Sequence, residues 1–186
     1  DIVIPSQTTI DGKVYNVTQI GTKSFYGCTG LKSVIIGNNV TLIEENAFEI
    51  CTGLISVTIG NKVEVIDVNA FKNCTQLTSV IIPNSVTSIG TFSFYNCAAL
   101  KSVTIGNRVT NIWSFAFENC TGLESITSLN PTPPACSENV FGYVDVSKVA
   151  LIVPSGSESL YKTTEPWKNF KFEGDSEEPS DDPAVD

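Results

Sequence analysis

The sequence predicts a repeat solenoid with a period of 23 residues, and three sets of recurring residues support this prediction. Cysteines, phenylalanines and leucines each recur at that interval and in a single register. Such a register identifies a repeated structural unit, and a unit this short is stable only when its copies stack. The three ladders are Cys28, Cys51, Cys74, Cys97 and Cys120; Phe25, Phe48, Phe71, Phe94 and Phe117; and Leu31, Leu54, Leu77, Leu100 and Leu123.

Each unit begins with a β-rich run, turns at a glycine or proline followed by asparagine, and returns through a short segment that ends in the phenylalanine. We expect a parallel β-sheet on one face of the coil, short turns or short helical segments on the other, and a cap at each end. The asparagines are expected to cap the turns. In the unit that begins at Leu31, the residues predicted to point inward are Leu31, Val34, Ile36, Val40, Ile43 and Phe48.

The unit resembles a known family of repeats. Leu31, Val34, Ile36 and Asn39 follow the spacing Leu-x-x-Val-x-Ile-x-x-Asn, and an Ala-Phe-x-x-Cys segment that begins at Ala47 closes the unit. This pattern resembles the BspA-like leucine-rich repeats of bacterial surface proteins, over about residues 2 to 172. The resemblance implies a leucine-rich-repeat-type solenoid in a cell-surface or secreted protein. It also implies adhesion to host extracellular-matrix proteins or to another cell surface, with a glycan as an alternative partner.

The N-terminal residues depart from the period. Ile4 lies 21 residues before Phe25, where the repeat requires 12, so nine residues are inserted. The insert contains Asp11-Gly12 between β-forming residues, which predicts a two-residue hairpin turn. We therefore expect an N-terminal cap with a hairpin insert over residues 1–24, followed by the solenoid over residues 25–129.

The C-terminal residues depart from the period as well. A proline-rich run at 130–134 prevents a regular continuation. We expect a last strand at 150–154 and a short helix at 157–163, with Trp167, Phe170 and Phe172 covering the final turn. These elements define a C-terminal cap over 130–172, and the residues that follow, 173–186, are expected to form an acidic disordered linker.

Composition and charge exclude several classes of function. The chain has 186 residues and a formal charge of −9, but seven of its 20 acidic residues lie in the last fourteen positions. The remaining 13 acids nearly balance the 11 basic residues, so the body offers no basic stripe for nucleic acid. No apolar run is long enough to span a membrane. The segment starts at Asp1 without a signal peptide, so an extracellular location implies that one preceded it.

Enzymatic chemistry has few candidate residues in this chain. Histidine is absent, which excludes Ser-His and Cys-His nucleophiles, and no cofactor motif occurs. The cysteine ladder is typical of buried structural thiols, although a disulfide between Cys120 and Cys136 stays open. Glu44 and Asp67 occupy equivalent positions in adjacent units, as a glycosidase pair would, but solvated surface acids are the favoured interpretation.

Two groups of residues are candidates for contact with a partner. Phe92 and Phe115 replace Asn46 and Asn69 of earlier units, and Trp113 occupies the position of Glu44 and Asp67. If that position faces solvent, the three aromatic residues form an apolar patch of the kind found at binding sites; the alternative is local repacking against the C-terminal cap. The second group lies on the outward sheet face, which is either a solvated face or a recognition surface: Lys32, Ile35, Ile55, Ile81 and Lys101.

These observations predict a non-enzymatic, cell-surface or secreted protein-binding or adhesion module. The first alternative is a structural spacer that presents another domain, and burial of the aromatic patch would favour it. The second alternative is a carbohydrate-active enzyme, which needs two convergent carboxylates in a cleft.

Overall fold

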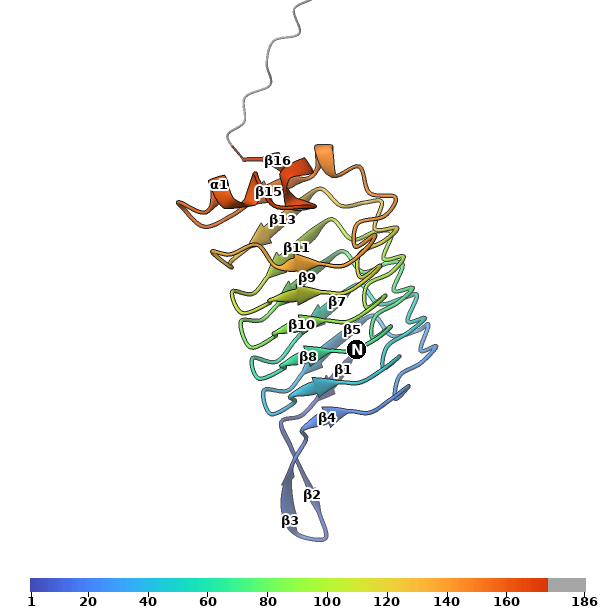
Figure 1. Cartoon of the computed structure of the whole chain (residues 1–186). Coiled ribbons are helices and arrows are strands. Elements are labelled where there is room, and N and C mark those ends of the chain that lie inside the picture. Colours follow the sequence, from blue (N-terminus) through green and yellow to red (C-terminus); the bar gives the residue numbers. More distant parts are fainter. Residues whose placement is uncertain (174–186) are drawn as a thin grey trace, which may run out of the picture.

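The structure is a computed structural model that describes residues 1–173. The predicted linker lies outside the described residues apart from Glu173. The chain winds into a coil with a parallel sheet on each of two opposite sides (Figure 1). The larger sheet, called sheet A, has eight strands, which are, in spatial order, β1 (Ile2–Ile4), β5 (Ser33–Ile36), β7 (Ser56–Thr58), β9 (Ser79–Ile82), β11 (Ser102–Ile105), β13 (Ser125–Ser128), β15 (Ala150–Ile152) and β16 (Lys171–Phe172).

A second sheet forms where we expected short turns or short helical segments. This sheet, called sheet B, consists of strands two residues long, and the repeats contain no helix within the described chain. Its strands, in spatial order, are β14 (Ala135–Cys136), β12 (Asn111–Ile112), β10 (Ser88–Ile89), β8 (Val65–Ile66), β6 (Leu42–Ile43) and β4 (Gln19–Ile20). Within each 23-residue repeat, a short connection leads from the strand of sheet A to the strand of sheet B. A longer connection then leads back to sheet A in the next repeat. These connections are called the short turn and the longer turn.

The register of sheet A confirms the 23-residue period. Ser33 pairs with Ser56, and Ser102 pairs with Ser79 and Ser125 on its two sides. Equivalent residues therefore stack directly above one another, which is how each turn buries its apolar face against the next. All six residues predicted to point inward in the unit from Leu31 are buried: Leu31, Val34, Ile36, Val40, Ile43 and Phe48.

The phenylalanine ladder forms a column of stacked rings beneath the longer turns. The ring centroids of Phe25, Phe48, Phe71, Phe94 and Phe117 are separated by 5.0 to 5.3 Å, and the rings are nearly parallel. Such offset aromatic pairs add to the stabilisation from apolar burial.

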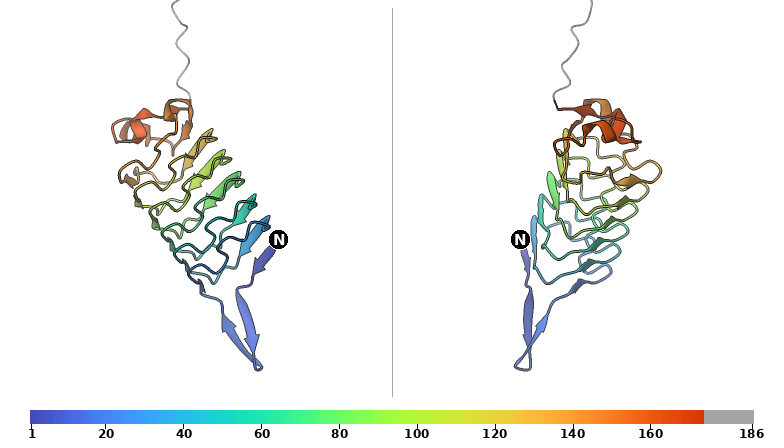
Figure 2. Two further views of the ribbon diagram at one scale, coloured as in Figure 1. Left: turned by 90° about the vertical axis from the view of Figure 1, so that its right-hand side faces the viewer. Right: turned by 60° about the vertical axis from the view of Figure 1, so that its left-hand side comes forward.

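The N-terminal end carries the hairpin expected around Asp11 and Gly12. Strands β2 (Gln7–Ile10) and β3 (Lys13–Asn16) pair antiparallel, and all their residues are exposed. Figures 1 and 2 show the hairpin projecting away from the coil. Strand β1 precedes the hairpin and pairs with β5, with Ile4 opposite Ile36.

The C-terminal end is covered by aromatic side chains. Helix α1 (Glu158–Tyr161) and the 3-10 helices η1 (Val146–Lys148) and η2 (Trp167–Asn169) lie beyond the last repeats (Figure 1). As predicted, Trp167, Phe170 and Phe172 are buried, and the first two contact the ring of Phe141. None of the helices in residues 1–173 has the length and apolarity needed to cross a membrane.

Candidate binding surfaces

The candidate contact residues lie on two different sides of the coil. Phe92, Trp113 and Phe115 belong to the longer turns that follow β10 and β12 of sheet B. Ile35 and Ile81 lie on strands of sheet A and point outward. The structure therefore divides the candidates into two separate surfaces.

The positions of Phe92 and Phe115 have an unusual backbone. Asn46 and Asn69, the equivalent residues of earlier turns, have φ angles of 57° and 55°, in the left-handed region. Asparagine is among the residues that tolerate this region best. Phe92 and Phe115 adopt the same conformation, with φ angles of 55° and 62°. For a bulky residue the left-handed region costs about 1–2 kcal/mol, so both phenylalanines are held in strained positions.

The two strained phenylalanines pack on each other. Their ring centroids lie 4.7 Å apart, with an angle of 10° between the ring planes. The ring of Tyr95 meets that of Phe92 edge on at 5.5 Å. Both phenylalanines are half-buried and stay accessible from one side. The stack is separate from the buried column of phenylalanines in the core.

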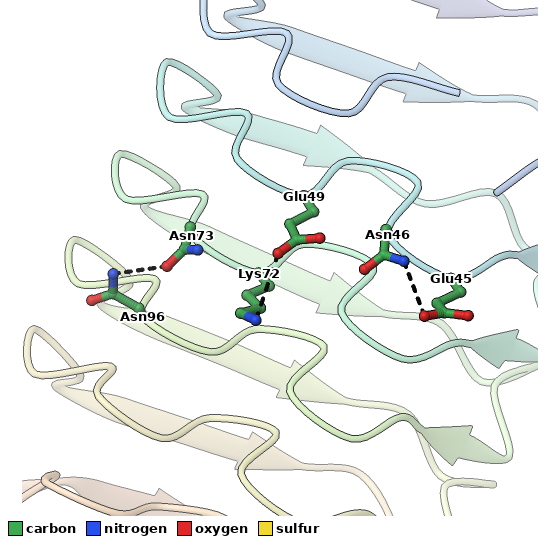
Figure 3. Close-up of polar contacts among 6 residues, drawn as sticks. All are labelled: Glu45, Asn46, Glu49, Lys72, Asn73 and Asn96. Carbon is green, nitrogen blue, oxygen red and sulfur yellow. Dashed lines mark hydrogen bonds and ion pairs between the residues drawn. The ribbon is translucent and has the colours of Figure 1, made fainter. Parts of the chain in front are cut away.

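Lys72 adds a positive charge beside the aromatic rings. Its Nζ atom lies 5.5 Å from the ring centre of Phe92 and 5.9 Å from that of Tyr95, within cation–π range. On its other side it forms an ion pair with Glu49 at 3.6 Å (Figure 3). The residues Lys72, Phe92, Tyr95 and Phe115, together with Trp113, are called the aromatic surface below.

Trp113 lies apart from the stacked pair, although it is on the same turn as Phe115. Its side chain is 48% exposed, and its Nε1 atom donates a hydrogen bond to Oγ of Ser88 at 2.8 Å. It has no ring contact with Phe92 or Phe115 in the structure of residues 1–173. The predicted patch is therefore divided into one exposed indole and a separate half-buried pair of rings.

Sequence reasoning missed Lys72 and Tyr95, which occupy equivalent positions in adjacent units. The sequence could have indicated them, because each follows by three residues the position at which phenylalanine replaces asparagine in later units. A second left-handed position in the same turn holds Ile50 in one unit and Asn73, Asn96 and Asn119 in the next three, and Asn96 donates from Nδ2 to Oδ1 of Asn73 at 2.9 Å (Figure 3). Among residues 1–173, phenylalanine stands in place of asparagine at the first of these two positions and not at the second.

The outward face of sheet A carries exposed isoleucines among hydroxyl groups. Ile35, Ile55 and Ile81 are 48%, 43% and 67% exposed. Lys32 and Lys101 are exposed as well, and Lys101 forms an ion pair with Glu124 at 3.1 Å. This face has little net charge and offers apolar contacts.

The cysteines form a structural ladder, as predicted, and all six are free thiols in the structure. Four are buried, and each donates a weak hydrogen bond to the carbonyl oxygen of a phenylalanine of the preceding turn. Burial raises the pKa of the Cys51 thiol to about 11 and that of Cys120 to about 12. High pKa values keep these thiols protonated and poorly nucleophilic. The four are Cys51, Cys74, Cys97 and Cys120, whereas Cys28 is exposed.

The carboxylates of Glu44 and Asp67 serve the local backbone. Glu44 accepts hydrogen bonds from the backbone N–H and the hydroxyl of Thr22, both at 2.8 Å. Asp67 accepts one from the backbone N–H of Val68 at 2.7 Å. Glu44 thus joins its turn of the coil to the preceding one, whereas Asp67 bonds within its own turn.

Comparisons with known proteins agree with the fold. The family model of the BspA type leucine rich repeat region matches residues 6–124 in six copies. The crystal structure of a T. pallidum leucine rich repeat protein, TpLRR, is similar, with a TM-score of 0.63 and 35% identity, over 68% of this chain and 57% of that one. The structure of the pneumococcal vaccine antigen PcpA is similar in fold, with a TM-score of 0.68 and 24% identity, over 84% of this chain and 40% of that one.

The matched regions cover only part of the similar proteins. This chain spans less than two thirds of either of these two structures. No curated protein matches it significantly. The family model, in contrast, covers more than half of the chain. The chain belongs to the BspA-type leucine-rich repeat family.

Proposed function

We propose that this chain is a non-enzymatic binding module of a bacterial cell-surface or secreted protein, and that it contacts a protein partner through the aromatic surface. The location rests on the family, because BspA-type repeats belong to bacterial surface proteins. The partner class, a host extracellular-matrix protein or a protein of another cell, rests on the same resemblance.

One observation carries the proposal for the aromatic surface. Phe92 and Phe115 occupy left-handed positions where Asn46 and Asn69 stand in earlier turns. Strain of this kind persists where the surrounding structure holds it, and it gathers at functional sites. The core does not require these rings, because a separate column of phenylalanines already fills it.

The composition of the surface also suits a protein interface. Aromatic residues are enriched at protein interfaces, and tryptophan and tyrosine are among those that carry most binding energy. Here Lys72 lies beside the partly accessible Phe92/Phe115 stack, and an exposed Trp113 belongs to the same turn as Phe115. An aromatic side chain or a carboxylate of a partner fits this combination of rings and positive charge.

The test compares three forms of the chain on an array of extracellular-matrix proteins and glycans. The first form is the unaltered chain, and the second is Phe92→Asn/Trp113→Ser/Phe115→Asn, which restores the residue type of earlier turns at two positions. The third is the control Tyr143→Ser, which removes an aromatic residue that is 81% exposed elsewhere. Circular dichroism establishes that all three are folded.

We expect the unaltered chain and the Tyr143→Ser control to bind the same matrix protein, and the triple variant to lose at least about tenfold in affinity. Retention of affinity by the triple variant would show that another surface makes the contact. Binding to a glycan alone would replace the protein partner. If no form binds, the chain is better explained as a structural spacer that presents another domain.

A further inference from the structure

Sheet A is interrupted between β7 and β9. The neighbouring pairs of strands are continuous, with four register pairs between β9 and β11 and three between β5 and β7. Between β7 and β9 only Ser56 and Ser79 pair. Beyond this pair β7 and β9 separate, whereas the pairing of the neighbouring strands continues further along their length.

A single residue accounts for the separation. Pro83 occupies the turn position that glycine holds in Gly37, Gly60 and Gly106. Stacked turns approach so closely there that a Cβ atom on Gly60 would overlap the carbonyl oxygen of Gly37. The proline ring therefore does not fit against Gly60, and β9 is displaced from β7.

Proline also removes a hydrogen-bond donor from the ladder. Leu129, at the equivalent position two turns later, donates its N–H to the carbonyl oxygen of Ile105 at 2.8 Å. Pro83 has no N–H to make the corresponding bond to Ile59. The crowding and the missing donor act in the same direction.

The asparagine ladder breaks at the same junction. The backbone N–H of Asn61 donates to Oδ1 of Asn38 at 3.0 Å, and that of Asn107 donates to Oδ1 of Asn84 at 2.9 Å. In the described chain no such bond joins Asn84 to Asn61. The turns remain joined on the sheet B side, where Thr87 donates its N–H to the carbonyl oxygen of Glu64 at 2.9 Å. The opening is thus local to sheet A.

The separation leaves a hollow on the outer face of sheet A. Val57 is only half-buried, whereas its equivalents Val34, Val80 and Val103 are 1 to 2% exposed. Ile81 is 67% exposed beside it. The hollow has a volume of about 210 Å³ and is lined by Val57, Thr58, Ile59, Ser79, Ile81 and Pro83.

We propose that this hollow is a docking site for one apolar side chain of an extended, uncharged segment of a protein partner. Its volume is smaller than the roughly 300–1,000 Å³ of typical small-molecule sites and suits a single side chain. Its floor is apolar, its rim carries hydroxyl groups, and no charged residue lines it. Beyond Ser56 and Ser79 no register pair joins β7 to β9, so backbone groups beside the hollow lack the ladder partners that the backbone of an extended segment supplies.

This site lies on a different side of the coil from the aromatic surface. The two proposals therefore fail or succeed separately. Neither proposal requires a partner that contacts both surfaces.

The test selects short random peptides on the full chain and measures their affinity for three variants. Pro83→Gly restores the residue type of the other turns and should close the hollow. Ile81→Thr removes the apolar wall and introduces the residue present at the equivalent positions Thr58, Thr104 and Thr127. Ile35→Thr is the matched control, because it makes the same change on the same face two turns away.

We expect the selected peptides to share one aliphatic or aromatic residue and to carry little charge. Their affinity should fall at least about tenfold for Pro83→Gly and for Ile81→Thr, and stay unchanged for Ile35→Thr. Peptides that bind all four chains equally, or a selection that yields none, would overturn the proposal. Phe92→Asn/Trp113→Ser/Phe115→Asn should keep these peptides, which separates this site from the aromatic surface.

Hydrogen exchange tests the structural cause independently. Pro83→Gly should slow exchange of the backbone amides in β9 and at Asn84, because the ladder with β7 closes. If exchange does not change, Pro83 is not the cause of the separation and the proposed site loses its basis.

Discussion

The thiol of Cys97 donates a hydrogen bond to the carbonyl oxygen of Phe71, with the two atoms 3.3 Å apart. This bond joins one turn of the coil to the preceding one, and both residues are fully buried. The ladder cysteine thus fills a small space and satisfies a backbone acceptor that water cannot reach.

Replacement of Cys97 by alanine should lower the free energy of unfolding by about 1–2 kcal/mol, because it leaves a small cavity and an unpaired carbonyl. Urea denaturation measures this change. Cys28→Ala is the control, since Cys28 is exposed, and its effect should stay within about 0.5 kcal/mol. Equal effects from the two variants would contradict the structural role of the buried ladder.

The same burial makes a prediction about reactivity and pH. Cys28 should react rapidly with a thiol reagent at pH 8, whereas Cys74, Cys97 and Cys120 should react only on unfolding. The folded pKa of Cys120, about 12, lies above the ordinary value of 9.0, because burial disfavours the thiolate. Above pH 9 the unfolded chain loses thiol protons that the folded chain keeps, so the free energy of unfolding should fall as pH rises.

Urea denaturation at pH 8 and at pH 10 checks the direction of this change. Cys120→Ala should reduce the pH dependence, because it removes one of the groups responsible. A stability that rises over this range, or fast labelling of all six thiols at pH 8, would be inconsistent with buried thiols.

The glycine of the short turn should tolerate no side chain. A Cβ atom at Gly60 would overlap the backbone of Gly37, whereas one at Gly30 would meet nothing within 4 Å. Gly60→Ala should therefore lower the melting temperature by an amount equivalent to about 1–3 kcal/mol. Gly30→Ala should be nearly neutral, and thermal denaturation of the pair checks the contrast.

The 23-residue interval in the sequence predicted how equivalent residues of successive repeats stack. The interval between Ser33 and Ser56 fixes the register of β5 and β7, and alternation places Val34 and Ile36 in the core. The second sheet was not predicted, because runs such as Leu42–Ile43 are too short to show a two-residue alternation. Stacking of neighbouring turns makes them strands, and that is a property of the assembled coil.

The aromatic surface was only partly predictable. The replacement of asparagine by Phe92 was visible in the sequence, but the strain at that position depends on a backbone angle. Asn46 and Asn69 carried a signal, since asparagine is enriched in left-handed positions. Likewise, Pro83 was visible as a turn residue, but its effect depends on how closely Gly60 approaches Gly37.

The measurement that tests the central claim most directly is the free energy of unfolding of Phe92→Asn/Phe115→Asn. If the two rings are held for binding, relief of about 1–2 kcal/mol of strain at each position offsets the lost contacts, of which stacking contributes about 0.5–1.5 kcal/mol. The variant should then unfold within about 1 kcal/mol of the unaltered chain. A loss of more than about 3 kcal/mol, the range for removing a core phenylalanine, would show that the pair is structural and would contradict a binding role.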